Sequence, residues 1–376
     1  MVLDKVGEKE IDDEARNAFI SCHKYANVSS DPIDLEEIVL APGDDMKGKA
    51  KKAMAFVNPN SGSGKAQKAL EKIKPIFDEA SVELIIKETE YAGHAIDMAK
   101  EEDLTGISYL VAIGGDGTLS EVINGFHGRR DLEEVKKRVA IGIIPAGTGN
   151  TFAYDLGLET VEQGARAIVG NKGRLVDLIE VTALDEEQGK QAGSPWYSIN
   201  IVGFGLAPAV LNRYESFRCC AFDCIRPALY EISAYFQVIS NPAYKCRFEF
   251  PEDSGVSKEV ADKLASMSDY SWIQAQNTVH MGARYPLCPR AKLDDGLMDL
   301  VVIKHLPRLS LIAAVTTGNE GKIESVSDAE YVQCSEFTLI PAKEDEGANT
   351  VNIDGELKGI SPMRVKVLPR DIYVCC

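Results

Sequence analysis

The stretch Ser108–Phe126, SYLVAIGGDGTLSEVINGF, decides the fold of this chain. It begins with the apolar run Tyr109–Ile113, which has the length and composition of a buried strand. The glycine-rich segment Gly114–Gly117, GGDG, breaks that run abruptly. Apolar residues then recur at spacings of three and four, which predicts a helix. We therefore expect a strand, a tight turn and a helix in succession.

The glycine turn has the chemistry of a phosphate site. Glycine lacks a β-carbon, so Gly114, Gly115 and Gly117 let a ligand approach the backbone closely. The following helix directs free N–H groups and the positive end of its dipole toward the turn. Asp116 would repel a phosphate unless it holds Mg²⁺ or accepts a proton from an attacking hydroxyl. The simpler alternative is a plain turn in which Asp116 caps the helix.

Two further loops of small residues support a phosphate site. Phe56–Lys65, FVNPNSGSGK, and Ile141–Asn150, IGIIPAGTGN, each continue from an apolar strand. In an open parallel sheet such loops lie along the carboxyl edge of the strands, where ligands bind. The first loop is not a Walker A loop, because Pro59 replaces its first glycine and Ala66 follows its lysine. The sequence therefore predicts a nucleotide site, but not that of a P-loop kinase.

Composition narrows the class of protein. The chain has 376 residues, of which 45% are hydrophobic, enough for two domains with full cores. Its net charge of -17 argues against nucleic acid as a partner and against broad adhesion to anionic membranes. No apolar run approaches the ~18 residues of a membrane span. The nine cysteines include no C-x-x-C spacing, which is typical of a reduced cytoplasmic protein.

The hydrophobic pattern divides the chain into three parts. Residues 1–51 form an acidic N-terminal extension, and residues 52–173 alternate strands with helices, as in a doubly wound α/β domain. Residues 174–376 contain successive strand-like runs, which predict a mainly antiparallel β domain. Its last strand is a candidate to return to the first domain. Within this part Gly205–Ser240 is helical and apolar, whereas Asp253–Asp269 is polar and is expected to be a loop.

Three blocks together resemble a known family. NPNSGSGK, GGDGTLSEVINGF and PAGTGN are similar to the conserved blocks of the diacylglycerol kinase catalytic domain. That superfamily holds diacylglycerol kinases, sphingosine and other sphingoid-base kinases, ceramide kinases and bacterial lipid kinases. The resemblance extends from Lys52 to Val374. It implies an α/β nucleotide-binding domain, a mainly antiparallel β-sandwich that binds the lipid, and an active site in the cleft between them.

The resemblance also implies ATP and Mg²⁺ as cofactors and assigns a site. Asp116 is our first candidate for the catalytic carboxylate, as base or as Mg²⁺ partner, and Glu356 is the second. Glu356 belongs to Ile353–Glu356, IDGE, which resembles a family block that returns near the active site; by chemistry alone it is a hairpin residue. The residues that we expect to contact the nucleotide are Asn58, Ser61, Gly62, Thr89, Gly114, Gly115, Gly117, Thr118, Glu121, Gly147, Thr148, Gly149, Asn150, Arg218 and Arg226.

Several of these residues have plainer alternatives. Thr89 begins TEYAGHA, which resembles a family stretch beside the nucleotide, but by chemistry alone it is a turn or cap residue. Glu121 could face the nucleotide or simply water, and Asn150 could cap the next helix. Arg218 and Arg226 resemble a phosphate-contacting pair of related lipid kinases, with a longer spacing than in sphingosine kinases. Their alternative role is in surface salt bridges.

The function indicated is that of an ATP-dependent lipid kinase acting at a membrane surface. Asp177 occupies the place where sphingoid-base kinases have a carboxylate for the substrate amine; alternatively it is a structural residue joining the domains. The GGDGT and GTGN blocks instead resemble diacylglycerol kinases, so both lipids stay open. A kinase for a soluble dinucleotide or sugar phosphate is one alternative, and a catalytically silent lipid-binding module is another. The apolar segment Ala207–Val238 favours a lipid, and the intact Asp116 and Glu356 argue against the silent module.

The oligomeric state is not predicted by any feature of the sequence, whereas membrane association is open to one specific hypothesis. We expect a cytoplasmic protein that meets membranes transiently or peripherally. Cys375 and Cys376 could carry prenyl or palmitoyl groups, and two such chains would anchor the protein stably. The alternative, which we favour, is that the two cysteines finish a strand.

Overall fold

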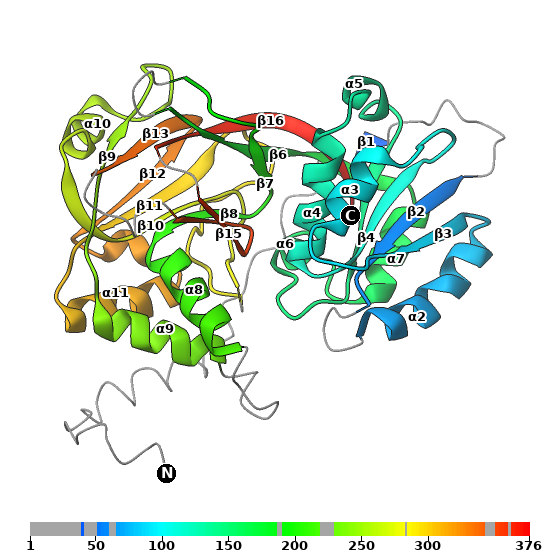
Figure 1. The fold of residues 1–376 in the computed structure, drawn as a ribbon, viewed down its shortest axis with the longest axis horizontal. Helices are drawn as coiled ribbons and strands as arrows, with labels where there is room; N and C mark the ends of the chain where they lie inside the picture. The colour runs from blue at the N-terminus through cyan, green and yellow to red at the C-terminus, as the bar shows by residue number, and fades with distance from the viewer. Residues whose placement is uncertain are drawn as a thin grey trace, which may run out of the picture.

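The computed structural model describes residues 39–40, 51–59, 65–185, 190–218, 229–282, 284–342, 350–359 and 362–376. Within these ranges the chain forms an α/β lobe and a lobe rich in antiparallel strands, joined by long strands (Figure 1). The predicted fold class is confirmed. None of the helices in these ranges is long and apolar enough to cross a membrane.

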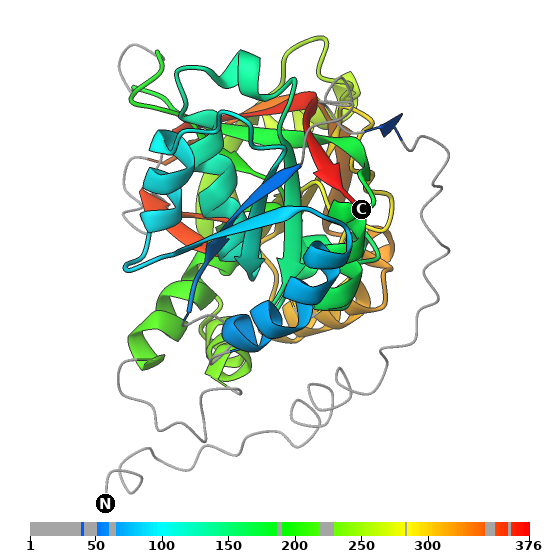
Figure 2. The same cartoon turned by 90° about the vertical axis from the view of Figure 1, so that its right-hand side faces the viewer.

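The α/β lobe is built on four parallel strands in the order β3-β2-β4-β5. Every residue of β4 and β5 is buried, because helices cover both faces of the sheet (Figure 2). Helices α2 and α7 pack on one face and α3 and α4 on the other. The bounds are β2 (Lys52–Val57), α2 (Lys65–Glu79), β3 (Glu83–Glu88), α3 (His94–Glu101), β4 (Tyr109–Gly114), α4 (Asp116–His127), α5 (Leu132–Val135), β5 (Ala140–Pro145), α6 (Thr151–Asp155) and α7 (Val161–Val169).

The second lobe is organised around β10, which pairs antiparallel with β8, β9 and β11. Helices α8, α9 and α11 lie against one face of these strands (Figure 1). The bounds are β1 (Val39–Leu40), β6 (Lys172–Ala183), β7 (Trp196–Ser198), β8 (Ile201–Gly205), α8 (Leu206–Arg218), α9 (Leu229–Ser240), β9 (Tyr244–Glu249), α10 (Lys258–Leu264), β10 (Ser268–Gln276), β11 (Met298–Lys304), α11 (Arg308–Asn319), η3 (Ile323–Ser325), β12 (Ala329–Cys334), β13 (Glu336–Pro341), β14 (Thr350–Ile353), β15 (Glu356–Gly359) and β16 (Met363–Cys375).

The long strand β16 joins the two lobes. Its first residues pair antiparallel with β13, most of its length pairs with β6, and its end pairs in parallel with β5. The register of the β6 pairing shifts between Leu368 and Ile372. In this bulge Asp371 accepts a hydrogen bond from Lys136 at 2.6 Å and contacts His127 Nε2 at 2.6 Å. The bulge therefore fastens the end of α4 to the strand that runs between the lobes.

The two adjacent cysteines, Cys375 and Cys376, lie at the end of this strand. Cys375 pairs with Gly173 of β6 and has no exposed surface. The N–H of Cys376 donates to the carbonyl of Lys172 at 3.1 Å. Burial raises the pKa of both thiols. This geometry matches the strand-ending alternative, because a lipid group attached to Cys375 would have no room in the folded strand.

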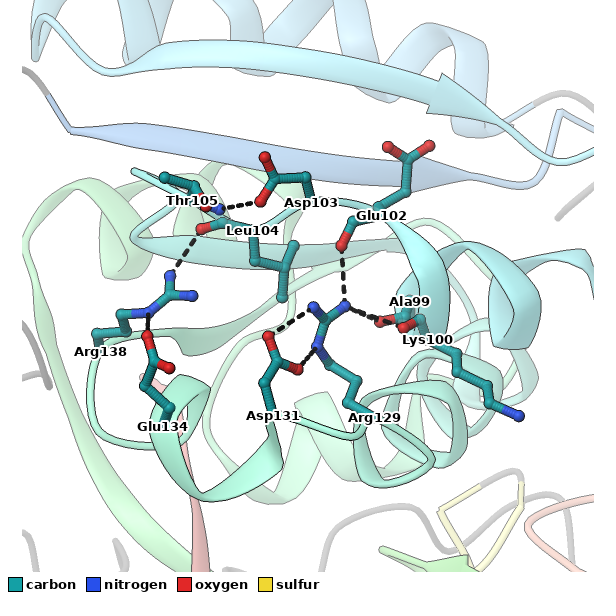
Figure 3. A network of polar contacts seen from close by, with 10 residues as sticks. All are labelled: Ala99, Lys100, Glu102, Asp103, Leu104, Thr105, Arg129, Asp131, Glu134 and Arg138. Atoms are coloured by element: carbon teal, nitrogen blue, oxygen red, sulfur yellow. Dashed lines mark hydrogen bonds and ion pairs between the residues drawn. The ribbon is translucent and has the colours of Figure 1, made fainter.

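Helix α3 is held at both ends by residues on or just after α4. At its N-terminus, the Glu121 carboxylate accepts the N–H groups of Gly93 and Ala95 at 3.0 and 3.2 Å. At its C-terminus, Arg129 donates to the carbonyl oxygens of Ala99 and Glu102, both at 2.9 Å (Figure 3). These contacts satisfy backbone groups that a helix end leaves without partners. These hydrogen bonds therefore hold α3 against α4, the helix that follows the GGDG turn.

We expect Arg129→Ala to lower the free energy of unfolding by about 2–3 kcal/mol, because three carbonyl groups at the end of α3, two of them in part-buried contacts, lose a charged donor. The Arg129 side chain is only 6% exposed and also pairs with Asp131 at 2.8 Å. Urea denaturation measures the effect. Arg138→Ala is the matched control: Arg138 donates to the carbonyl of Leu104 but is more exposed, so its loss is expected to be smaller. Equal losses would contradict a special role for Arg129.

The second lobe contains elements that the sequence pattern does not predict, among them helix α11. The segment Asp253–Asp269, expected to be a loop, contains α10, whose first turn is capped by the Ser257 hydroxyl. A solvent-facing helix of seven residues is too polar and short to produce a clear apolar period. Strand β12 was also missed, because most of its residues are only half-buried and it shows no clean alternation.

Candidate active site

The loops that follow β4 and β5 meet at the carboxyl edge of the parallel sheet. A β-carbon at Gly147 would lie 2.3 Å from the Cα of Gly115, so the two loops cross with only glycine between them. Asn150, in the left-handed region with φ of 53°, fixes the second loop by accepting the Gly147 N–H and donating to its carbonyl, at 3.0 and 3.2 Å. Thr148 and Gly149 remain exposed beside this crossing.

Asp116 caps a helix, but not its own. It is the first residue of α4, while its carboxylate accepts the N–H groups of Thr151 and Phe152 at 3.0 and 3.2 Å. These groups begin α6, so Asp116 takes the capping role that Asn150 was a candidate for. The carboxylate also accepts a hydrogen bond from Asn200 Nδ2 at 3.4 Å. A carboxylate has about four acceptor positions, so Asp116 can still receive a substrate hydroxyl.

Among the described glycines of the GGDG and PAGTGN loops, Gly117 is the one with open space where a β-carbon would lie. A β-carbon at Gly114 would lie 2.3 Å from the hydroxyl oxygen of Thr118, and one at Gly149 would lie 2.9 Å from the Asp116 carboxylate. Internal packing therefore explains those two glycines. No heavy atom lies within 4 Å of a β-carbon at Gly117, which is exposed in the first turn of α4. A phosphate can reach the backbone and the positive end of the helix dipole at this position.

Asn58 and Thr89 lie at the same edge of the sheet. Asn58 directly follows β2 and is half-buried, and Thr89 directly follows β3 and is 8% exposed. The Thr89 N–H donates to the carbonyl of Val57 at 2.9 Å, which brings the two strand ends together. Ser61 and Gly62, from the same predicted loop, lie outside the described residues.

The second lobe contributes Glu356. It is the first residue of β15, and Lys358 Nζ lies 2.7 Å from its Oε2 atom. The Lys358 ammonium also lies 3.7 Å from the ring centroid of Trp196. Burial raises the pKa of Glu121, and the negative charge of Glu356 raises it further. The Glu121 and Glu356 carboxylates, which come from different lobes, therefore repel one another.

Two residues that the sequence did not single out connect these groups. The buried Asp354 accepts hydrogen bonds from the Ser198 hydroxyl and from the N–H groups of residues 199, 200 and 201, at 2.7 to 3.0 Å. It thereby shapes the turn that presents Asn200 to Asp116. A hydrogen-bonded path thus runs from Asp116 through Asn200 to Asp354, two residues before Glu356. The IDGE block was the available signal for Asp354, but its partners lie about 150 residues earlier.

Asp177 lies in a closed turn. It has no exposed surface, and its carboxylate accepts the N–H groups of Gly296 and Arg370, both at 2.6 Å. Gly296 ends the turn Leu293–Gly296 and Arg370 lies in the β16 bulge, so Asp177, on β6, ties three segments together. Burial raises the pKa of Asp177 to about 6. These contacts favour the structural alternative, and the substrate role of Asp177 stays a prediction.

We expect Asp177→Asn to weaken the fold and to affect any lipid substrate equally. An amide NH₂ would face one of the two backbone donors. The folded pKa lies above the unfolded value, so the wild-type group stabilises the fold when protonated and loses that contribution as pH rises through about 6. The stability advantage of wild type over the variant should therefore shrink between pH 4 and 7, by up to about 3 kcal/mol. An advantage that grows with pH, or a selective rise in KM for a sphingoid base, would contradict this account.

The two arginines that were expected to contact phosphate are only partly described. Arg218 is the last residue of α8, and its side chain lies outside what the structure describes. Arg226 lies outside the described residues altogether. Their predicted role therefore stays a prediction.

The donor set around Asp116 fits a magnesium ion that is held mainly by phosphate. Among the described residues no group of three or more His, Cys, Asp or Glu side chains is arranged to hold a metal. Mg²⁺ in nucleotide sites commonly uses one or two carboxylates together with phosphate oxygens and water. Asp116 meets that requirement beside the open backbone of Gly117. When bound, the ion would neutralise charge on the transferred phosphate.

Comparison with known proteins identifies lipid kinases as relatives of this chain. The family "Diacylglycerol kinase catalytic domain" matches residues 52–181, and the "YegS C-terminal NAD kinase beta sandwich-like domain" matches residues 252–376. The chain is 28% identical to sphingosine kinase 1 of Arabidopsis thaliana over 346 residues, which cover 82% of this chain and 69% of that protein. It is 26% identical to the diacylglycerol kinase of Bacillus subtilis over 327 residues, or 86% of this chain and 96% of that protein.

A solved structure shows the same fold. The crystal structure of a diacylglycerol kinase from Bacillus anthracis superposes with a TM-score of 0.61, at 21% identity, and the match covers 87% of this chain and 96% of that chain. The arrangement of a parallel α/β lobe followed by an antiparallel β lobe is therefore shared with that protein.

Proposed function

Because the chain belongs to the diacylglycerol kinase catalytic domain superfamily, we propose that it transfers the γ-phosphate of ATP to the hydroxyl of a sphingoid base or a diacylglycerol. The observation that carries this proposal is the position of Asp116 beside the open backbone of Gly117. A carboxylate next to a phosphate-sized opening at a helix N-terminus suits phosphoryl transfer, which depends on positioning and on charge stabilisation.

Each residue then has a defined task. The α4 N-terminus at Gly117 receives the phosphates, and the Gly115–Gly147 crossing keeps the two loops in register. Asp116 accepts the proton of the lipid hydroxyl or holds Mg²⁺, and Asn200 orients its carboxylate from the second lobe. Glu356 is the second carboxylate, and Lys358 beside it limits its repulsion of phosphate.

The rival acceptors differ in chemistry, so one screen separates them. ADP release is measured with ATP and Mg²⁺ in the presence of dioctanoylglycerol, sphingosine, a dinucleotide and a sugar phosphate. The proposal expects turnover with at least one lipid in micelles and none with the soluble acceptors. Turnover with a soluble acceptor alone would overturn the lipid assignment. Lipid binding without any ADP release would mean a silent module. The proposed setting is the cytoplasmic face of a membrane, reached by peripheral association.

A further inference from the structure

One face of β10 carries two buried glutamines beneath the helices of the second lobe. Side chains alternate along a strand, so Trp272, Gln274 and Gln276 point to the same side. Trp272 packs there with apolar residues of α8 and α9, including Leu206 and Val238. Both glutamines have no exposed surface. A pair of polar side chains therefore lies inside an otherwise apolar layer.

Each glutamine has one hydrogen-bonding atom without a partner among the described residues: Nε2 of Gln274 and Oε1 of Gln276. The orientation of each amide is set by its other atom. Gln276 Nε2 donates to the carbonyl oxygens of Thr278 and Val279 at 2.7 and 3.2 Å, and Gln274 Oε1 accepts from the Trp272 indole at 3.5 Å. One donor and one acceptor are thus left over. Buried polar atoms without partners are costly and rare in folded proteins, so a pair of them needs an explanation.

The two amides lie in line with the candidate catalytic carboxylate. Gln276 pairs with Ile201 of β8, which follows Asn200, the residue that contacts Asp116. Gln274 pairs with Gly203, which is three residues beyond Asn200, or about 10 Å along the strand. Gln276 is therefore the nearer of the two amides to a lipid hydroxyl at Asp116, and Gln274 lies deeper along the strand.

The absence of a side chain at Gly203 lets α8 pack closely against the glutamine amides. A β-carbon at Gly203 would lie 2.8 Å from the Ala207 side chain of α8 and 2.8 Å from Gln274 Oε1. The glutamines therefore lie directly between the strand face and the helix. Phe236 and Ile239 of α9 are 48% and 36% exposed. Apolar side chains exposed beside a buried apolar layer are suited to exchanging contacts with acyl chains.

We infer that Gln274 and Gln276 bind the ester or amide linkage of an uncharged acyl lipid. This inference rests on the proposed function and deepens it. The Gln274 NH₂ group matches a carbonyl oxygen, and Gln276 Oε1 matches a hydroxyl or an amide N–H. Neither side chain carries charge, so a buried ammonium ion would lie here without a counter-ion. The buried carboxylates Asp177 and Asp354 are already held by backbone donors. The pair therefore favours diacylglycerol-type over sphingoid-base substrates.

The test uses Trp272 as the reporter of lipid binding. The chain has two tryptophans, so Trp196→Phe leaves Trp272 as the single fluorophore on the glutamine face. In this background Gln274→Leu and Gln276→Leu are titrated with dioctanoylglycerol and with sphingosine in detergent micelles, and the Tm of each protein is measured without lipid. Gln333→Leu is the matched control, because that amide lies on β12 and has partners in Arg290 and Asp299.

The expected signature separates folding from binding. Gln274→Leu removes one unpartnered atom and only one long hydrogen bond, so its Tm without lipid should change little. Gln276→Leu leaves the carbonyl groups of Thr278 and Val279 without their donor, so its Tm should fall. The affinity for dioctanoylglycerol should fall by about tenfold or more, while the already weaker binding of sphingosine changes little. Gln333→Leu should lower the Tm and leave lipid affinity unchanged.

Unchanged dioctanoylglycerol affinity in both leucine variants, or tighter binding of sphingosine than of dioctanoylglycerol by wild type, would overturn the inference while leaving lipid kinase activity intact. A lower Tm with unchanged affinity would assign the amides a purely structural role. If wild type binds neither lipid and transfers phosphate to a soluble acceptor, the proposed function itself fails.

Discussion

Asp116→Asn is expected to lower the rate of phosphate transfer by about 10³-fold or more while the affinity for ATP changes by less than about tenfold. The amide cannot accept a proton and is a poor ligand for Mg²⁺, whereas the open backbone at Gly117 is unchanged. The variant should also lose about 1 kcal/mol of stability, because one N–H group at the start of α6 loses its acceptor. Turnover kinetics and a nucleotide titration measure the two effects separately.

The control variant must weaken the contacts that hold α6 without changing the Asp116 carboxylate. Asp155, at the other end of α6, accepts the N–H of His280 at 3.1 Å and pairs with its ring at 2.5 Å. Asp155→Asn therefore weakens the hold on the same helix but keeps the Asp116 carboxylate. It should retain most of the turnover. A loss as large as that of Asp116→Asn would mean that both residues act by positioning α6, and retained turnover in Asp116→Asn would remove Asp116 from the reaction.

The second large effect separates two glycines that look alike in the sequence. Gly117→Val should fold normally and lose ATP affinity by about tenfold or more, because its side chain would project into open space where phosphate approaches. Gly147→Val should lose about 1–3 kcal/mol of stability as well as ATP affinity, because its β-carbon would lie 2.3 Å from the Cα of Gly115.

Calorimetric titration with ATP and urea denaturation of both variants measure the contrast. The useful comparison is the folded Gly117→Val protein, whose stability should remain within about 0.5 kcal/mol of wild type. Wild-type ATP affinity in that variant would place the phosphates elsewhere. Wild-type stability in Gly147→Val would show that the two loops do not cross as closely as described.

The parts of the fold that the sequence predicts are those set by local pattern. The strand, turn and helix of Ser108–Phe126 appear as β4 and α4, because apolar period and glycine position act within a few residues. The apolar run Met363–Leu368 predicts only the first part of strand β16. The chain bulges there, at Pro369–Asp371, and then resumes pairing with β6 up to Cys375. A bulge of this kind depends on partners elsewhere in the chain, and the local sequence does not contain them.

The candidate active site also has parts that the local sequence predicts and parts that it does not. The glycine loops and the presence of a carboxylate at Asp116 follow from the blocks in the sequence. That Asp116 caps α6 and contacts Asn200 does not follow, because those partners lie 35 and 84 residues away. Asp177 illustrates the same limit: its two donors, at 119 and 193 residues' distance, give its carboxylate a role that residue type alone leaves open.

The fate of the γ-phosphate tests the central claim most directly. Wild-type protein and Asp116→Asn are incubated with γ-³²P-labelled ATP, Mg²⁺ and micelles containing dioctanoylglycerol and sphingosine, and the organic phase is separated by thin-layer chromatography. The account predicts label in a phosphorylated lipid with wild type and almost none with Asp116→Asn. Label that stays in ATP, appears only as inorganic phosphate, or enters lipid equally with both proteins would contradict it.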